Sequence, residues 1–257
     1  MRLIFIEGVS GVGKTTLAQT LCGKLNEMGH AAYCYLEGDI ANPIDFYCTA
    51  YLTREKYADL LADCPMFSED IARNTIVAED VMLVRYHDWE TPLFPEPLLT
   101  DLCKHEFCWD PVHPVPISEY TRVYKSVWEQ FALNASKQHA YLIFDGSLLH
   151  HPINDMTRNY DASPDQVMHH INMLIETVHA FRPWIVYLSS DDVAGQLRKA
   201  LLCRQQPPPS AEQIQFWENR MRMDFAVMRQ LSISYDILDI SEGNWDFCLQ
   251  YLLNELR

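Results

Sequence analysis

The chain has 257 residues, of which 48% are hydrophobic and 21% are charged, a balance typical of a folded globular protein. Its formal net charge is −15, and proteins that bind a nucleic-acid backbone need an excess of Lys and Arg, so nucleic acid is excluded as a partner. Apolar runs such as WIVYL at 184–188 fall far short of the roughly 20 residues of a membrane-spanning helix, and the first residues lack a signal-peptide pattern. We therefore expect a cytoplasmic protein with no membrane partner.

The first element expected along the chain is a buried strand, because residues 2–7 (RLIFIE) form a short apolar run rich in β-forming side chains. A helix is expected to follow from Lys14, and Gly29 supplies a stop signal. The apolar residues that recur at helical spacing in this stretch are Leu17, Leu21, Leu25 and Met28.

The junction between this strand and this helix carries the pattern of a phosphate-binding P-loop: Gly8, four residues, then Gly13-Lys14-Thr15. Glycines allow successive backbone N–H groups to point at phosphate oxygens, and the start of the helix adds its positive dipole. Lys14 is expected to reach the β- and γ-phosphates of ATP, and the Thr15 hydroxyl to bind Mg²⁺. The alternative, a flexible glycine turn, is disfavoured by the strand-to-helix context. The residues expected to hold the nucleotide are Gly8, Ser10, Gly11, Val12, Gly13, Lys14, Thr15 and Thr16.

The middle of the chain predicts two more strands separated by a long insertion. AAYCYLEGD at 31–39 reads as a strand that ends near Glu37, and HAYLIFDGS at 139–147 reads as one that ends at Asp145. Residues 45–139 are mostly helical in pattern and are interrupted by proline clusters. A long insertion between two strands of one sheet usually carries function.

The last hundred residues alternate between helices and strands. Ser163 and Gln166 form a capping box around Pro164, which predicts a helix start, and further helices are expected from Val193, from Ala211 to about Leu231, and through Leu253. PWIVYLSS at 183–190 and ISYDILDI at 233–240 supply two more strands. This alternation predicts an α/β fold, a parallel sheet with helices on both faces, and a ligand site at the carboxyl ends of the strands.

Carboxylates at these strand ends are the candidates for chemistry. Asp145 is placed to hold Mg²⁺ with Thr15, directly or through water, although Asp-Gly is also a common turn pair. Glu37 is our first choice, and Asp39 our second, for a general base that accepts a proton from the phosphoryl acceptor. The alternative is that one of the two caps the next segment.

Basic residues gather late in the chain. Residues 198–229 contain six Lys and Arg against three Asp and Glu, and a proline-rich break lies among them. We interpret residues 198–222 as a lid over the phosphates, with Arg198 and Arg204 as the groups that stabilise the transferring phosphoryl. A solvated helix face is the alternative for such a run of charges.

Cysteine and histidine give no comparable signal. The eight cysteines are scattered and are expected to be free thiols. The cluster Cys103, His105, Cys108 and His113 fits no compact zinc pattern. The adjacent histidine pairs at 150–151 and 169–170 make poor metal-ligand sets, because the side chains of neighbouring residues point in different directions.

The sequence resembles the P-loop kinases of nucleosides and nucleotides, among which deoxynucleoside and thymidylate kinases are the best understood. The resemblance rests on FIEGVSGVGKTT, on Glu37, on LIFDGS and on the Arg-bearing segment after IVYLSSDD. FDGSLLHHPINDM and YLEGDIANPIDF look closest to uncharacterised bacterial kinase-like P-loop proteins. The resemblance implies a three-layer P-loop NTPase fold with strand order 2-3-1-4-5, use of Mg-ATP, a mobile lid, and Glu37 in the place of the general base. Deoxynucleoside kinases carry an Arg between the acidic residue and the Ser that end their third strand, whereas this chain has Gly146 there.

These observations lead to one hypothesis and one alternative. The hypothesis is a single P-loop kinase-like domain over 1–257 that transfers the γ-phosphoryl group of ATP to a small acceptor beneath the 45–139 insertion. The acceptor is a nucleoside, a nucleotide, a metabolite or an antibiotic, and a cationic acceptor is one interpretation of the acidic charge. The alternative is a nucleotide-dependent switch, although the Asn-Lys-x-Asp motif that reads guanine is missing. Assembly into a homodimer is left open.

Overall fold

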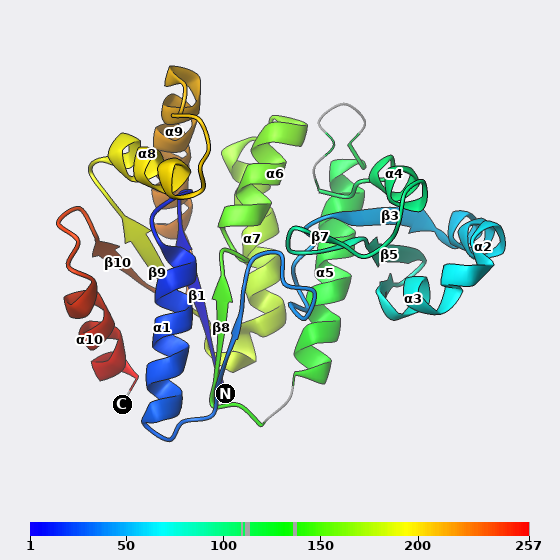
Figure 1. Cartoon of the computed structure of the whole chain (residues 1–257). Helices are drawn as coiled ribbons and strands as arrows, with labels where there is room; N and C mark the ends of the chain where they lie inside the picture. Colours follow the sequence, from blue (N-terminus) through cyan, green and yellow to red (C-terminus); the bar gives the residue numbers. More distant parts are fainter. Residues whose placement is uncertain (109, 111–113, 136–137, 257) are drawn as a thin grey trace. The chain divides into compact units, whose positions relative to one another are not determined.

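The structure is a computed structural model that describes residues 1–108, 110, 114–135 and 138–256. Figure 1 shows the arrangement of its helices and strands. The chain divides into two compact units. The first comprises Met1–Leu36, Ser136–Ile153 and Pro164–Arg257, and the second comprises Glu37–Ala135 and Asn154–Ser163.

The first unit is built on a parallel sheet of five strands in the order β10-β9-β1-β8-β2. Counted along the chain within this sheet alone, that order is the expected 2-3-1-4-5, and strands of other sheets intervene between its second and third members. β1 lies at the centre, where Ile4 pairs with Ile143 of β8 on one side and with Trp184 of β9 on the other. The strands are β1 (Arg2–Gly8), β2 (Ala32–Tyr35), β8 (Tyr141–Asp145), β9 (Trp184–Ser189) and β10 (Ser234–Asp239).

Helices cover both faces of this sheet (Figure 1). Leu17 and Leu21 of α1 and Leu252 of α10 pack in one buried cluster with Ile4 and Ile6 of β1. The opposite face presents Tyr187 of β9, whose ring contacts Phe225 of α9. The helices of the unit are α1 (Lys14–Glu27), α7 (Pro164–Val178), η2 (His179–Phe181), α8 (Val193–Cys203), α9 (Ala211–Met228) and α10 (Trp245–Glu255). The helix starts expected at Lys14, Pro164, Val193 and Ala211 are confirmed.

α6 (His150–Tyr160) begins in the first unit and ends in the second. The sequence patterns had not indicated a helix at this point. Tyr120 of α5 donates a hydrogen bond to Asp155 of α6 over 2.9 Å, which holds the later turns of α6 within the second unit.

The expectation that residues 45–139 are mostly helical is wrong for the first half of this segment. β3 (Thr49–Thr53), β5 (Val81–Arg85) and β4 (Thr75–Ala78) form an antiparallel sheet in that order, and β6 (His87–Asp88) pairs with β7 (Thr91–Pro92). The residues of β4 and β5 are TIVA and VMLVR, and such β-branched side chains favour extended backbone. The helices of this unit are α2 (Arg54–Asp63), η1 (Pro65–Phe67), α3 (Ser68–Arg73), α4 (Leu98–Cys103) and α5 (Ile117–Asn134).

The second unit has its own hydrophobic core, in which Leu52 of β3, Leu60 of α2, Val84 of β5 and Leu102 of α4 are all buried. Within the described residues, no helix combines the length and the apolar character needed to cross a bilayer.

Candidate nucleotide-binding site

The P-loop connects the carboxyl end of β1 to the start of α1, as its sequence context predicts. Gly8, Gly11 and Gly13 have φ angles of 142°, 85° and 87°, in the region that residues with a side chain rarely adopt. Neighbouring elements also leave no room for a side chain at these positions. A Cβ atom would lie 2.6 Å from the Leu188 carbonyl oxygen at Gly8, 2.9 Å from the Ala200 Cβ at Gly11, and 2.7 Å from the Trp245 ring at Gly13. The loop is therefore fixed in its curled conformation by β9, α8 and α10.

Lys14, the first residue of α1, is almost fully buried, with 6% of its surface exposed. Its ammonium group donates a hydrogen bond to the carbonyl oxygen of Val9 over 3.3 Å, so the side chain folds back over the loop. Its aliphatic stem passes Gly146, where a Cβ atom would lie 3.4 Å from the Lys14 Cε. The cation is thus held against the glycine turn and beside the strand end at Gly146.

Thr15 and Asp145, which lie far apart in the sequence, meet directly. The Thr15 hydroxyl donates to the Asp145 carboxylate over 2.5 Å, and Asp145 is completely buried at the end of β8. Both groups present oxygen atoms that can act as metal ligands. Mg²⁺ prefers a site with one or two protein oxygens that leaves coordination positions for water and phosphate. The pair therefore fits Mg²⁺. Over the residues that the structure describes, there is no cluster of three or more His, Cys, Asp or Glu side chains suited to a metal. His113, one of the four residues weighed for zinc, lies outside those residues.

A second layer of polar groups fixes the loop that follows Asp145. The Glu7 carboxylate is fully buried and accepts hydrogen bonds from the backbone N–H groups of Leu148, Leu149 and His150, over 2.8, 3.0 and 2.9 Å. Burial raises the pKa of Glu7 to about 7, and the three N–H donors and Lys14 act in the opposite direction. Glu7 therefore ties the start of α6 to the last residues of β1.

His150 completes the connection between this loop and the P-loop. Its Nδ1 lies 3.0 Å from the carbonyl oxygen of Gly8, and because that oxygen only accepts, the proton is on Nδ1. Burial lowers the pKa of His150 well below its usual value, and the nearby Lys14 and Arg220 lower it further. The ring stacks on Trp217 of α9, with the planes 5° apart. Sequence reasoning had treated His150 as an ordinary residue, and its only signal was its position shortly after the strand end at Asp145.

The basic residues of the 198–222 segment lie in contrasting environments. Arg198, on α8, and Arg204, just after that helix, are exposed. Arg220 of α9 is buried, and its guanidinium donates to Asp224 over 2.8 Å and to the carbonyl oxygens of Leu149 and His150 over 2.9 and 3.1 Å. Arg220 is thus a structural anchor for the start of α6, whereas Arg198 and Arg204 keep their charges at the surface.

Glu37 and Asp39 open the second unit and follow the end of β2. Their loop is firmly held. The Asp45 carboxylate accepts from the Gly38 N–H over 2.7 Å, and the buried Arg85 guanidinium donates to backbone carbonyl oxygens on both sides, at Ile40 and Asp45. Glu37 itself is half-buried. Its role as a base, and that of Asp39, remain predictions.

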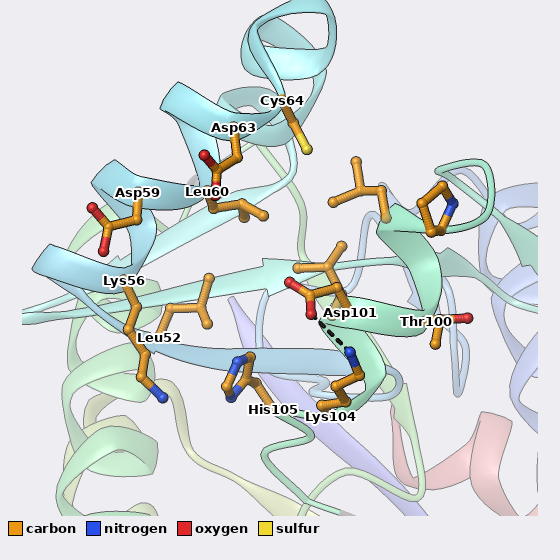
Figure 2. A pocket seen from close by; sticks show the side chains of 13 residues that line it. Leu52, Lys56, Asp59, Leu60, Asp63, Cys64, Thr100, Asp101, Lys104 and His105 are labelled. Atoms are coloured by element: carbon orange, nitrogen blue, oxygen red, sulfur yellow. Dashed lines mark hydrogen bonds and ion pairs between the residues drawn. The ribbon is translucent and has the colours of Figure 1, made fainter.

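The second unit also contains a cavity of about 430 Å³ between α2 and α4. Figure 2 shows Lys56 and Asp59 of α2, and Asp101 of α4, around this cavity, with Asp101 paired to Lys104. Leu52 and Leu60 give it apolar walls. None of the site residues predicted from the sequence lines it.

No family model matches the chain, and no curated protein matches it. Among solved structures, thymidylate kinase from Candida albicans is similar at 10% sequence identity and a TM-score of 0.46, over 99% of this chain and 90% of that one. A similarity at this level does not identify the function of this chain.

Proposed function

We propose that the chain is an ATP-dependent kinase that transfers the γ-phosphoryl group to a small-molecule acceptor. The observation that carries the proposal is the contact between Thr15 and Asp145 beside a glycine turn that admits no side chains. The proposal is supported by the glycine turn, the Lys14 cation and two oxygen groups of the kind that Mg²⁺ prefers, all at the carboxyl edge of one parallel sheet. A glycine turn that binds no ligand does not require a buried lysine and a buried carboxylate beside it, because burying either group costs free energy.

In this proposal the P-loop backbone N–H groups and Lys14 hold the phosphates of ATP, and Thr15 and Asp145 hold Mg²⁺. The metal, when bound, neutralises charge on the phosphate oxygens. Arg198 and Arg204 supply positive charge to the transferring phosphoryl, and their exposed positions leave them free to approach a nucleotide. Glu37, with Asp39 as the second choice, accepts the proton of the acceptor.

The acceptor belongs to a wide class: a nucleoside, a nucleotide, or a small metabolite or antibiotic with a hydroxyl or guanidine group. The net charge of −15 favours an acceptor with positive charge over one with many negative charges, since the summed field of the protein influences which ligands approach it. The segment 45–139 is the proposed source of the acceptor pocket.

The decisive experiment measures ATP turnover with Mg²⁺ against a panel of such compounds, with mass spectrometry of the compound that stimulates it. A kinase gives strong stimulation by one compound and a mass gain of one phosphate. Lys14→Ala should reduce kcat/KM by at least about a hundredfold, since it removes a charged contact to the transferring group. Lys24→Ala is the matched control, because Lys24 lies on the same helix but is exposed and paired with Glu27.

Two results would count against the proposal. Turnover that no compound stimulates, but that a protein partner does, would point to a nucleotide-dependent switch. A Lys14→Ala variant as active as its parent would show that the P-loop takes no part in the reaction. Within an active kinase, Glu37→Gln and Asp39→Asn compare the two candidate bases, and the larger loss of kcat identifies the base.

A further inference from the structure

A second concentration of positive charge lies at the opposite edge of the central sheet, where β1, β9 and β10 begin with Arg2, Trp184 and Ser234. Because all five strands are parallel, this amino edge is at the other end of the sheet from the P-loop. A cavity of about 410 Å³ opens there, lined by Arg2, His179, Arg182, Ser232 and Ser234, with Pro183 and Ile233. We call it the amino-edge pocket.

Within the described residues, neither arginine of this pocket is paired with a carboxylate. The Arg2 guanidinium lies 4.4 Å from the centre of the Trp184 ring, a cation–π contact that orients it. Arg182 follows η2 at a φ of 49°, and its backbone N–H donates to the carbonyl oxygen of His179 over 3.0 Å, which fixes the main chain at this point. Over the described part of the chain, neither guanidinium forms an ion pair or a side-chain hydrogen bond.

Two acidic groups lie near Arg2, but within the described residues neither forms an ion pair with it. Asp236 and Glu255 attract Arg2 from nearby. The oxygens of the Asp236 carboxylate accept hydrogen bonds from the Trp184 ring nitrogen over 2.7 Å and from the Tyr251 hydroxyl over 2.9 Å, and not from Arg2. Partial burial and the repulsion from Arg182 lower the pKa of Arg2 despite these acids. Two cations therefore face one opening in a chain whose net charge is −15.

We propose that the amino-edge pocket binds a phosphate group, as free phosphate or as a small phosphomonoester. Two guanidinium groups offer the paired N–H donors that phosphate oxygens accept, and His179 and the hydroxyls of Ser232 and Ser234 add further polar contacts. The cavity volume is within the range of small-molecule sites. Trp184 is only 2% exposed and offers no ring face for a base to stack on, so the pocket recognises the phosphate rather than a nucleobase.

This site is separate from the nucleotide-binding site and does not depend on the proposed kinase activity. An anion bound there would contact the first residues of β1, β9 and β10 and the segment that leads from η2 into β9. The negative net charge opposes long-range attraction of any anion, so binding must come from short-range contacts to the two arginines.

The test must remove phosphate binding at the P-loop, which we do by using Lys14→Ala as the parent protein. Calorimetric titration of this parent with inorganic phosphate, at constant ionic strength, should show uptake of one phosphate per chain. Arg182→Gln in the same background should weaken the affinity by at least about tenfold, the size of one lost charge-assisted hydrogen bond. Arg73→Gln is the matched control, because Arg73 is an exposed arginine of the second unit, and it should leave the affinity unchanged.

A second variant separates a loss of phosphate binding from a loss of folding. Arg2→Lys keeps the charge over Trp184 but loses the planar fork of N–H donors, so it should weaken phosphate binding while the thermal midpoint stays close to that of the parent. The same titration with glycerol 3-phosphate distinguishes the two sources of phosphate: tighter uptake than of inorganic phosphate identifies an ester, and equal or weaker uptake identifies the free ion. The proposal is overturned if the parent takes up neither, or if the Arg2 and Arg182 variants bind as well as the parent.

Discussion

At the scale of single residues, Gly13 and Gly23 respond differently to the same small change. Gly13 has a φ of 87° and faces the Trp245 ring, whereas Gly23 lies within α1 with open space around it. Gly13→Ala adds backbone strain and a steric clash, so it should lower the free energy of unfolding by about 1–3 kcal/mol and weaken nucleotide binding. Gly23→Ala should raise the free energy of unfolding by about 0.5–1 kcal/mol, because alanine loses less backbone entropy in a helix. Urea unfolding of both variants measures the difference, and a change of the same sign in both would contradict the interpretation.

At the scale of elements, α9 is joined to the start of α6 by Arg220, which also forms a buried ion pair within α9. Arg220 and Asp224 lie one turn apart on α9, and the Tyr187 hydroxyl donates to the same Asp224 carboxylate over 2.7 Å. Arg220→Met should cost about 3–5 kcal/mol of unfolding free energy, because it leaves the Asp224 charge buried without its partner. Arg220→Met combined with Asp224→Leu should recover part of that loss, since the orphaned charge is also removed. Denaturant unfolding of the two variants tests this, and a double variant less stable than Arg220→Met alone would show that Asp224 does not depend on Arg220.

The elements also show how far the sequence predicts the fold and the site. The strand-to-helix context of the P-loop, the helix starts at Lys14 and Pro164, and the strand end at Asp145 follow from local patterns, because hydrophobic periodicity and glycine placement act within a few residues. The environment of Arg220 does not follow from such patterns. In the sequence it resembles the exposed Arg198, and only the packing of α9 against the start of α6 buries it. β3 was missed for the same reason, since its partner β5 lies far along the chain and a local window does not contain it. β4 and β5 form a hairpin across Glu79 and Asp80, so their β-branched residues were a local signal that the helical interpretation of this segment overlooked.

At the scale of the whole molecule, two small sites with buried or clustered cations lie within an acidic protein. Lys14 lies at the carboxyl edge of the central sheet, and Arg2 and Arg182 lie at its amino edge. The remaining surface carries most of the net charge of −15, which keeps anions away unless backbone N–H groups or arginines contact them directly. The parallel sheet therefore separates the two proposed anion sites, which a uniformly basic surface would merge.

The stability of the whole molecule should also depend on pH through a buried histidine. His170 of α7 has no exposed surface, and burial, with a smaller effect of His169, lowers its pKa to about 3 from an ordinary value of 6.5. In the unfolded chain the His170 imidazole therefore takes up a proton near pH 6.5, whereas in the folded chain it stays neutral until a much lower pH. The contribution of His170 to the free energy of unfolding is complete above pH 6.5 and is lost as the pH falls toward 3. Between pH 7.5 and pH 5.5 this histidine alone should lower the free energy of unfolding by about 1.4 kcal/mol. His170→Gln removes the titration, so urea unfolding at the two pH values should show a drop smaller by about that amount in the variant than in the wild type. His150, whose pKa is also lowered, contributes equally to both proteins, and an identical drop in the two would mean that His170 does not titrate as its burial requires.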